Sequence, residues 1–210
     1  DEKELGVALI DIGGGTTDLV IYSDGGIVHT GVLPIGGNQI TSDIAYGLRS
    51  PHLEAERIKH RYGCALGSLV SEDDMMEVPS VGGRPAREVK RQQLSAIVEP
   101  RVEEIFRMVR AELERSGHAD KLASGIVITG GSSLLEGVPE LAEEVLGVPV
   151  RRGIPKGIGG LVDVVRNPMH ATGVGLVLHG AGAHDAAALR PDPSSRGVWN
   201  KMRAWFSEVF

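Results

Sequence analysis

The segment LIDIGGGTTDLVIY, from Leu9 to Tyr22, brings together residue types that bind anions. It places Asp11 at the end of one apolar run, three glycines after it, and Thr16 and Thr17 at the start of the next run. Glycines let backbone N–H groups approach an anionic oxygen without side-chain obstruction, and adjacent N–H groups form a concave anion site. Phosphate fits such a site, with Asp11 facing it through Mg²⁺ or an ordered water. Taken alone, a run of three glycines would favour an ordinary glycine-rich hairpin turn.

A second glycine segment, IVITGGSSLLEG, lies at residues 126–137. Its unalternating apolar run predicts a strand buried on both faces, followed by a polar turn at Gly130, Gly131 and Ser132. Between the two glycine segments, EAERIKHRYG puts Glu56 and Lys59 three residues apart on one face of a predicted helix. This pair either reaches the hydroxyls of a ribose or forms a solvated ion pair, and these residues alone leave both possibilities open.

The elements that must position these residues begin with three apolar or β-branched runs at residues 5–10, 17–22 and 26–33. Glycine turns separate the runs, which predicts an antiparallel meander. Asn38 is expected to cap the helix that follows, because apolar residues recur after it at helical spacing.

A different pattern occupies residues 51–119, with a predicted helix near Glu54–Tyr62, a Gly/Pro-rich stretch and a long helical segment that Pro100 kinks or divides. We interpret this part as an inserted lobe. The sheet pattern then resumes, and the remaining predicted elements are a strand at 124–129, a helix at 139–146, a strand at 148–151 and a helix at 169–179.

Strands in a meander, followed by strands that alternate with helices, predict an α/β fold with a mixed sheet. We expect the core domain to be discontinuous and the insertion to be an α+β lobe. The predicted divisions are a core at 1–50 and 120–180, an inserted lobe at 51–119, a flexible linker at 181–197 and an amphipathic helix at 198–210.

Composition narrows the function classes. The net charge of -6 and a pI near 5.7 argue against nucleic acid as the main partner, because phosphate backbones require a clustered positive field. The single cysteine, Cys64, excludes an internal disulfide and is expected to be buried packing. We expect neither a signal peptide nor a spanning helix, since no stretch approaches the ~18 apolar residues that a span needs.

The last dozen positions hold four of the eight aromatic residues, which is the most uneven feature of the composition. On a helix, the apolar residues of VWNKMRAWFSEVF fall within an arc of roughly 140°. Two basic residues lie at its margins, which is typical of a helix that lies in a membrane interface. The predicted membrane-binding residues are Trp199, Met202, Trp205, Phe206 and Phe210, with Lys201 and Arg203 at the margins.

The pattern D-x-G-x-G-T between two strands resembles the second phosphate motif of the actin, heat-shock chaperone and sugar kinase superfamily, which has a ribonuclease H-like fold. The later glycine pair is similar to the adenosine motif of that superfamily, and the helix with Glu56 and Lys59 is similar to its Glu/Lys helix. The resemblance implies ATP as the ligand, with Mg²⁺ held through Asp11 and the nucleotide. The nucleotide-binding residues that it implies are Asp11, Gly13, Gly14, Gly15, Thr16, Thr17, Glu56, Lys59, Gly130, Gly131 and Ser132.

Longer strings narrow this resemblance to the FtsA family: IDIGGGTTDLVIY, PIGGNQITSDIAYGL, AERIKHRYGCAL, VPSVGGRP, the EPR of IVEPRVEEI, and IVITGGSSLLEG. The resemblance implies an actin-like, ATP-binding scaffold with at most weak ATPase activity. It also implies polymerisation, contact with other divisome proteins, and tethering of FtsZ filaments to the cytoplasmic face of the inner membrane at the division site.

Elements that the resemblance places upstream, including a first phosphate loop, are not found in these residues. We therefore expect weak nucleotide binding and no catalysis by this chain alone. The alternative function is an ATP-dependent sugar or carboxylate kinase of the same superfamily, but a kinase has no use for an aromatic amphipathic tail.

Basic residues concentrate in the predicted inserted lobe of this otherwise acidic chain. They form either a solvated surface or a partner site. In the FtsA family this lobe receives the acidic C-terminal peptide of FtsZ, so charge complementarity would assist the encounter. The candidate partner-binding residues are Arg84, Arg87 and Arg101.

Overall fold

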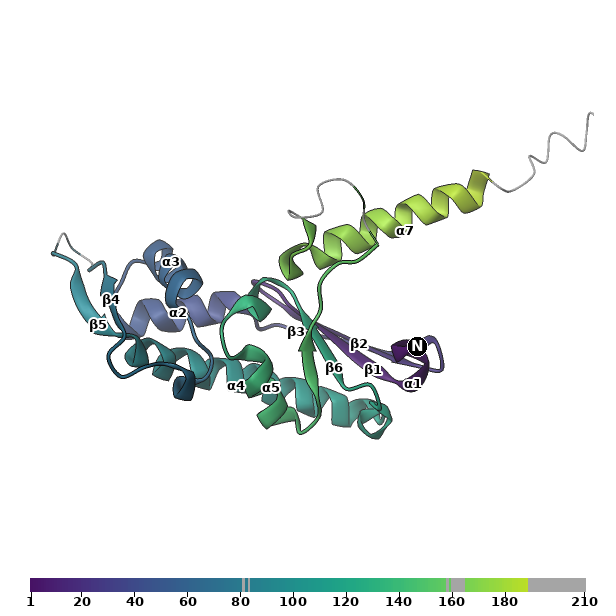
Figure 1. The fold of residues 1–210 in the computed structure, drawn as a ribbon, viewed down its shortest axis with the longest axis horizontal. Coiled ribbons are helices and arrows are strands. Elements are labelled where there is room, and N and C mark those ends of the chain that lie inside the picture. Colours follow the sequence, from purple (N-terminus) through teal and green to yellow (C-terminus); the bar gives the residue numbers. More distant parts are fainter. Residues whose placement is uncertain (81, 83, 158, 160–164, 189–210) are drawn as a thin grey trace, which may run out of the picture. The chain divides into compact units, whose positions relative to one another are not determined.

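A computed structural model describes most of the chain (Figure 1): residues 1–80, 82, 84–157, 159 and 165–188. The chain divides into two compact units, Asp1–Ala171 and Thr172–Phe210. The first unit holds the sheet and nearly all of the named elements. In the second unit, the described residues belong to helix α7 (Ala171–Ala188).

The first unit is built on a five-stranded sheet in the order β3-β2-β1-β6-β7. The first three strands pair antiparallel, as the meander predicted, whereas β6 pairs parallel to β1 and β7 parallel to β6. The predicted mixed α/β sheet is therefore confirmed. The strands are β1 (Val7–Ile12), β2 (Thr17–Ser23), β3 (Gly26–Leu33), β6 (Ile126–Thr129) and β7 (Val150–Arg152).

Helices α2 (Gly37–Gly47), α4 (Arg91–Ser116) and α5 (Val138–Leu146) enclose the main core with one face of this sheet (Figure 1). Alternate strand residues supply the sheet side, for example Ile10 and Ile21, which are fully buried. A β-strand directs successive side chains to opposite faces, so this face is apolar while Asp11 and Asp18 lie on the other.

Helix α3 (His52–Tyr62) packs against α2, and a separate two-stranded sheet follows, formed by β4 (Met75–Val78) and β5 (Arg87–Lys90). Helix α4 begins directly after β5 and contains Pro100 within it. A single helix therefore spans the whole long segment, so the alternative in which Pro100 starts a new helix is wrong. The short elements are α1 (Glu2–Leu5) and the 3₁₀ turns Gly67–Leu69, Ala119–Lys121, Gly131–Leu134 and Pro168–His170.

Two details differ from the sequence predictions. The N-cap of α2 is Gly36 rather than Asn38, and the Gln39 side chain accepts a hydrogen bond from the Gly36 N–H at 2.9 Å. The first N–H groups of α2 donate to carbonyls of the glycine turn at Gly13 and Gly14, so the Asn38 side chain is not needed as a cap. Helix α7 runs to Ala188, into the segment that was predicted as a linker, and residues 189–197 lie outside the described part of the chain.

Cys64 is fully buried, as predicted, and burial raises the pKa of its thiol. Its Sγ donates to the Leu66 carbonyl at 3.2 Å. A buried, protonated thiol is a poor nucleophile, so packing is the role that the structure supports. None of the described helices is long and apolar enough to cross a membrane.

Candidate functional site

A cleft of about 290 Å³ opens in the first unit, where the turn after β1, the start of α2, the end of α3 and the turn after β6 meet. The parallel pairing of β1 with β6 brings the turns after these two strands to the same edge of the sheet. The cleft is lined by Gly13, Gly14, Gly37, Asn38, Glu56, Lys59, His60, Arg61, Gly63, Arg91, Gly131, Ser132, Leu134, Leu135 and Glu136.

The glycine turn after β1 is fixed by its backbone. The Gly13 N–H donates to the Thr16 carbonyl at 2.9 Å, which closes the turn. The first N–H groups of α2 then donate to the turn, from Gly37 to Gly13 at 2.9 Å and from Asn38 to Gly14 at 2.7 Å. A helix start leaves its first N–H groups unsatisfied, so this turn also serves as the backbone cap of α2.

Two N–H groups of this turn are left for a ligand. Among the described residues, the N–H groups of Gly14 and Gly15 take no part in the backbone hydrogen bonds that close this turn and cap α2. Both residues are exposed, and a side chain at Gly15 would meet no atom within 4 Å. Adjacent, unobstructed N–H groups are the feature that an anionic oxygen requires.

Asp11 lies beside the second glycine turn. Gly130 has φ +86, and a Cβ placed there would stand 2.3 Å from the Asp11 carboxylate and 2.5 Å from the Ile12 carbonyl. Only glycine fits this position, because the left-handed φ and the close approach both exclude a side chain. Gly130 therefore allows the two glycine turns to pack at the carboxyl ends of β1 and β6.

Ser132 ties the two glycine turns together. Its hydroxyl donates to the Gly13 carbonyl at 3.1 Å, the same oxygen that accepts from the Gly37 N–H. A Cβ at Gly37 would stand 2.5 Å from the Ser132 hydroxyl, so this junction also has no room for a side chain. The predicted phosphate turn and adenosine turn are thus parts of one framework.

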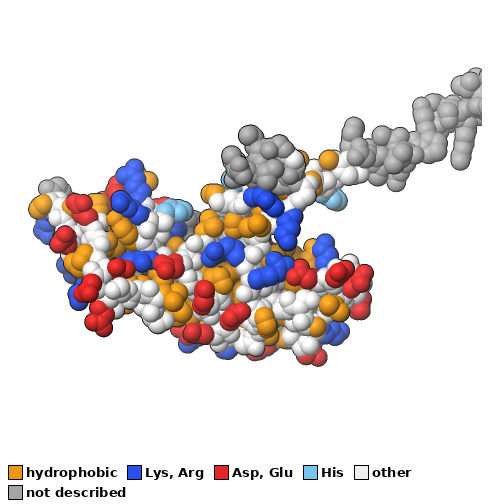
Figure 2. Space-filling model, viewed as in Figure 1, with side chains coloured by type: hydrophobic (Ala, Val, Ile, Leu, Met, Phe, Trp, Pro, Cys, Tyr) orange, Lys and Arg blue, Asp and Glu red, His pale blue; other side chains and the backbone are white. Residues whose placement is uncertain are grey.

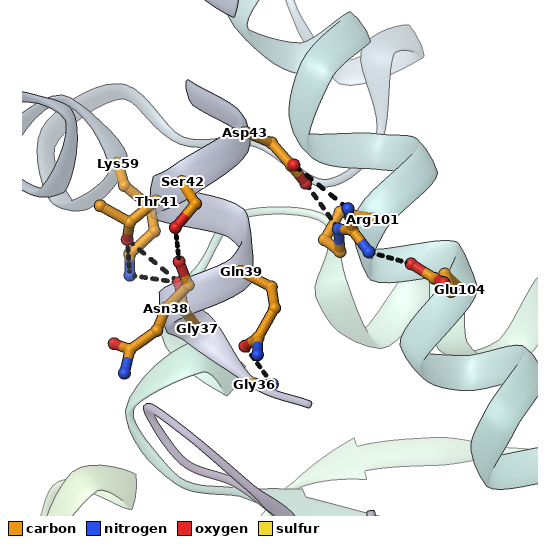
Figure 3. A network of polar contacts seen from close by, with 10 residues as sticks. All are labelled: Gly36, Gly37, Asn38, Gln39, Thr41, Ser42, Asp43, Lys59, Arg101 and Glu104. Carbon is orange, nitrogen blue, oxygen red and sulfur yellow. Dashed lines mark hydrogen bonds and ion pairs between the residues drawn. The ribbon is translucent and has the colours of Figure 1, made fainter. Parts of the chain in front are cut away.

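Helix α3 contributes Glu56 and Lys59, and Figure 3 shows the Lys59 side chain reaching the first turns of α2. The Lys59 ammonium donates to the Gly37 carbonyl at 3.0 Å, to the Thr41 hydroxyl at 2.8 Å and to the Glu56 carboxylate at 2.8 Å. Thr41 also donates to Glu56. Lys59 is only 5% exposed and bridges α3 to α2, so it does not form a solvated ion pair with Glu56, whose carboxylate is partly exposed.

The electrostatics of Glu56 follow from these contacts. Partial burial raises the pKa of its carboxyl, but hydrogen bonds from Lys59 and Thr41 outweigh burial and hold the pKa below its usual range. His60 lies 2.9 Å from the other carboxylate oxygen. The cleft therefore presents an ionised carboxylate whose two oxygens are both held by neighbours.

The opposite wall of the cleft was not anticipated from the sequence. Arg91, at the start of α4, donates to the Tyr62 carbonyl at 2.8 Å and pairs with Glu136 and with Asp74. This guanidinium connects the end of α3 to the turn after β6 and closes the cleft between them. No motif surrounds Arg91, so no local signal in the sequence could have placed it there.

The predicted nucleotide-binding residues divide into two groups. Gly13, Gly14, Glu56, Lys59, Gly131 and Ser132 line the cleft, whereas Asp11, Gly15, Thr16, Thr17 and Gly130 do not. Thr17 is fully buried, and its hydroxyl donates to the Ile35 carbonyl at 2.8 Å, which fixes the segment before α2. Thr16 is exposed and donates to Asp18 at 3.1 Å.

The three candidate partner-binding arginines of the predicted lobe do not share one surface. Arg84 and Arg87 line a hollow of about 380 Å³ with Arg49, a residue that the sequence did not single out. We call this surface the basic hollow; its residues are Arg49, Ser80, Arg84, Pro85, Ala86 and Arg87. On the face shown in Figure 2, acidic and basic side chains are interspersed.

Arg101 is not part of the basic hollow. Its guanidinium contacts Asp43 on α2 at 2.5 and 3.1 Å, and it also pairs with Glu104 (Figure 3). The hydrogen bond with Asp43 raises the pKa of Arg101. The structure therefore gives Arg101 a clear internal role, which is to join α4 to α2.

The predicted membrane-binding residues lie outside the described part of the chain. They are Trp199, Lys201, Met202, Arg203, Trp205, Phe206 and Phe210.

Comparison with solved structures supports the fold. MreB5 of Spiroplasma citri bound to ADP matches with a TM-score of 0.69 and 19% identity, covering 90% of this chain and 57% of that one. A PilM–PilN type IV pilus biogenesis complex matches with a TM-score of 0.61 and 21% identity, covering 85% of this chain and 47% of that one. At these identities the likeness concerns the fold, which is actin-like as predicted.

Comparison with curated relatives is closer in sequence. Cell division protein FtsA of Pseudomonas aeruginosa is 57% identical over 180 residues, which cover 86% of this chain and 43% of the relative. The Escherichia coli protein of the same description is 43% identical over 221 residues, covering 100% of this chain and 53% of the relative. The chain thus spans about half the length of these relatives.

The family model described as cell division protein FtsA matches residues 8–175, a range that includes both glycine turns and helix α3. That range is most of the chain and contains every residue that lines the cleft. The chain therefore belongs to the FtsA family of cell division proteins.

Proposed function

We propose that this chain is the nucleotide-binding half of an actin-like cell-division scaffold that polymerises and tethers FtsZ filaments to the inner membrane at the division septum. The observation that carries the proposal is the cleft, in which two glycine turns and helix α3 converge around the Ser132–Gly13 contact. MreB5, whose fold is similar, was solved with ADP bound. Nucleotide binding would set the assembly state, with at most weak ATPase activity.

The cleft residues fit an adenine nucleotide. The N–H groups of Gly14 and Gly15 would bind phosphate oxygens, and the Glu56 carboxylate would accept hydrogen bonds from ribose hydroxyls. The glycine pair Gly130–Gly131 would let the nucleoside approach the backbone. Asp11 would meet the phosphates through Mg²⁺, since a carboxylate and a phosphate are both anions and a cation between them offsets their repulsion.

Calorimetry with ATP tests this proposal. The chain should bind ATP weakly by itself, whereas a chimaera that adds the upstream lobe of a full-length relative should bind it tightly and with Mg²⁺ dependence. Equal and tight binding by both proteins would show that the upstream lobe is unnecessary. Absence of binding by the chimaera would remove nucleotide from the proposal, and phosphoryl transfer from ATP to a sugar or carboxylate would favour the kinase alternative.

We propose the basic hollow as the site for the acidic C-terminal peptide of FtsZ. Arg49, Arg84 and Arg87 provide three guanidinium groups around one concave surface. Guanidinium groups bind carboxylates through paired hydrogen bonds, so an acidic peptide is the partner that this surface fits. The scaffold would contact other divisome proteins and further copies of itself through other surfaces.

The membrane anchor of this proposal is the aromatic tail at residues 198–210. A helix of thirteen residues is about 20 Å long, too short for the ~30 Å hydrocarbon layer, so it would lie in the interface. The chain should sediment with anionic liposomes, whereas Trp205→Glu or truncation after Gly197 should leave it soluble and folded. If either variant binds lipid as the parent does, the anchor lies elsewhere.

A further inference from the structure

Thr41, on the second turn of α2, does not line the cleft, yet it contacts both charged residues that α3 places there. Its side chain is fully buried. Its neighbour Ser42 is exposed and donates to the Asn38 carbonyl at 2.9 Å, as a helix-surface hydroxyl commonly does. The two adjacent hydroxyls of α2 therefore sit in opposite environments.

The polar atoms around Thr41 can all be satisfied at once. A hydroxyl has one proton to donate and accepts through its lone pairs. The Thr41 hydroxyl accepts from Lys59 and lies within hydrogen-bond distance of two acceptors, the Glu56 carboxylate and the Gly37 carbonyl (3.0 Å). Because Lys59 also donates to the Gly37 carbonyl at 3.0 Å, we assign the single Thr41 proton to the Glu56 carboxylate. No donor in this cluster is left without an acceptor, and a fully satisfied buried network holds one geometry.

The same count assigns the donors of Lys59. An ammonium has three N–H groups, and Lys59 has three acceptors within 3.0 Å: the Gly37 carbonyl, the Thr41 hydroxyl and the Glu56 carboxylate. Its side chain is nearly all buried. Lys59 thus has no N–H group to spare for a ligand, whereas Glu56 is partly exposed in the cleft.

We propose that Thr41 is a positioning residue for the nucleotide cleft: with Lys59, it holds the Glu56 carboxylate in the orientation that receives a ribose. This inference rests on the proposed nucleotide function. Glu56 is the group that meets the ligand, and Thr41 acts only through it. The charged groups around Glu56 are Lys59, His60 and Arg61 on its own helix, with Arg91 and Glu136 lining the same cleft.

The first test needs no nucleotide. The pKa of the Glu56 carboxyl is followed by carbon-detected NMR in the chain and in Thr41→Val, which keeps the shape of the side chain but removes the hydroxyl. The pKa should rise in Thr41→Val, because one of the two hydrogen bonds that lower it is lost, and should return toward the parent value in Thr41→Ser. An unchanged pKa in the folded Val variant would show that Thr41 does not hold Glu56.

The second test measures nucleotide discrimination in the chimaera that carries the upstream lobe. Thr41→Val should weaken ATP binding about tenfold, the effect of losing one well-formed hydrogen bond to a charged group. It should also bring the ratio of the affinities for ATP and 2′-deoxyATP toward one, which a loss of stability alone would not do. Thr41→Ser should restore both values, and Ser42→Ala should leave them unchanged because that hydroxyl faces solvent.

The outcomes separate the two proposals. If the parent chimaera does not bind ATP, the nucleotide function fails while the NMR result still decides the role of Thr41. If the parent binds ATP and Thr41→Val retains its affinity and its discrimination, the positioning role is wrong. Should Thr41→Val not fold, Thr41→Ala provides the same comparison with a smaller side chain.

Discussion

A set of nucleotide-binding residues and a set of partner-binding arginines were both predicted from the sequence, and the structure arranges the two sets differently. In the cleft, residues from three separate motifs converge, and the contacts among them are mostly made by backbone atoms of glycines. In the predicted lobe, only Arg84 and Arg87 share a surface, while Arg101 pairs with acidic residues of α2 and α4.

The difference lies in how strongly each residue type restricts its surroundings. A glycine at positive φ, such as Gly130, fits one backbone conformation and one distance of approach, so its position in a motif carries geometric information. An arginine has a long side chain that reaches many acceptors, so a cluster of arginines in the sequence does not define a cluster in space. Arg101, for example, donates to Asp43, which lies 58 positions away in the sequence.

The largest effect that we predict is at Gly130. Gly130→Ala should lower the free energy of unfolding by about 3 kcal/mol or more, because the new Cβ would overlap Asp11 and the Ile12 carbonyl. Gly117→Ala is the matched control, since Gly117 has φ +70 but no atom within 4 Å of the added Cβ. Its cost should be only the left-handed conformation, about 1 kcal/mol. Equal losses in urea denaturation would show that the glycine turns are not tightly packed.

A moderate effect should separate the arginines of the predicted lobe. Arg84→Glu should weaken binding of an acidic FtsZ tail peptide roughly fivefold at low salt, and the loss should shrink as salt is added. Arg101→Ala should instead reduce stability by about 1 kcal/mol, since it breaks a partly buried ion pair with Asp43. Peptide affinity and thermal midpoint are measured for both variants. If Arg101→Ala lowered affinity as much as Arg84→Glu, the partner surface would extend beyond the basic hollow.

Arg87 is a less clean probe than Arg84 because its guanidinium also donates to the Leu48 carbonyl. A loss of peptide affinity in Arg87→Glu could therefore come from a local rearrangement of the connection between α2 and α3. Arg84 has no such backbone contact among the described residues. For this reason Arg84 provides the decisive comparison with Arg101.

The smallest effect concerns acid pH. The pKa of Glu56 is lowered in the folded chain, so its stabilisation is present above the unfolded value of about 4.3 and is lost as pH falls through the folded pKa. Glu56→Gln should therefore have a lower thermal midpoint than the parent at pH 6, and the gap should narrow below pH ~4. Glu54→Gln, on the same helix, removes an exposed ion pair with Arg57 and should change little at either pH. A gap that stays constant with pH would contradict the lowered pKa.

Most of the secondary structure followed from periodicity and turn residues. The three-strand meander, helices α3 and α5 and strand β6 lie within a few residues of the predicted positions. The N-cap of α2 was predicted incorrectly. The Gly36 N–H donates to the Gln39 side chain, and the first N–H groups of α2 donate to the glycine turn of Gly13 and Gly14. The second contact joins two segments of the chain, so the periodicity of one segment does not predict it.

The sequence by itself determined the two glycine turns, the strands that lead into them and the spacing of Glu56 and Lys59, because each depends on local conformation or on the helical repeat. Tertiary structure decided which polar groups are available to a ligand. All three N–H groups of Lys59 donate to protein acceptors, which are on Gly37, Thr41 and Glu56. Arg91 reaches the cleft from α4 through contacts with Tyr62 and Glu136. Apart from the Lys59–Glu56 pair within α3, these hydrogen bonds join segments that only the packed fold brings into contact, so local pattern carries no information about them.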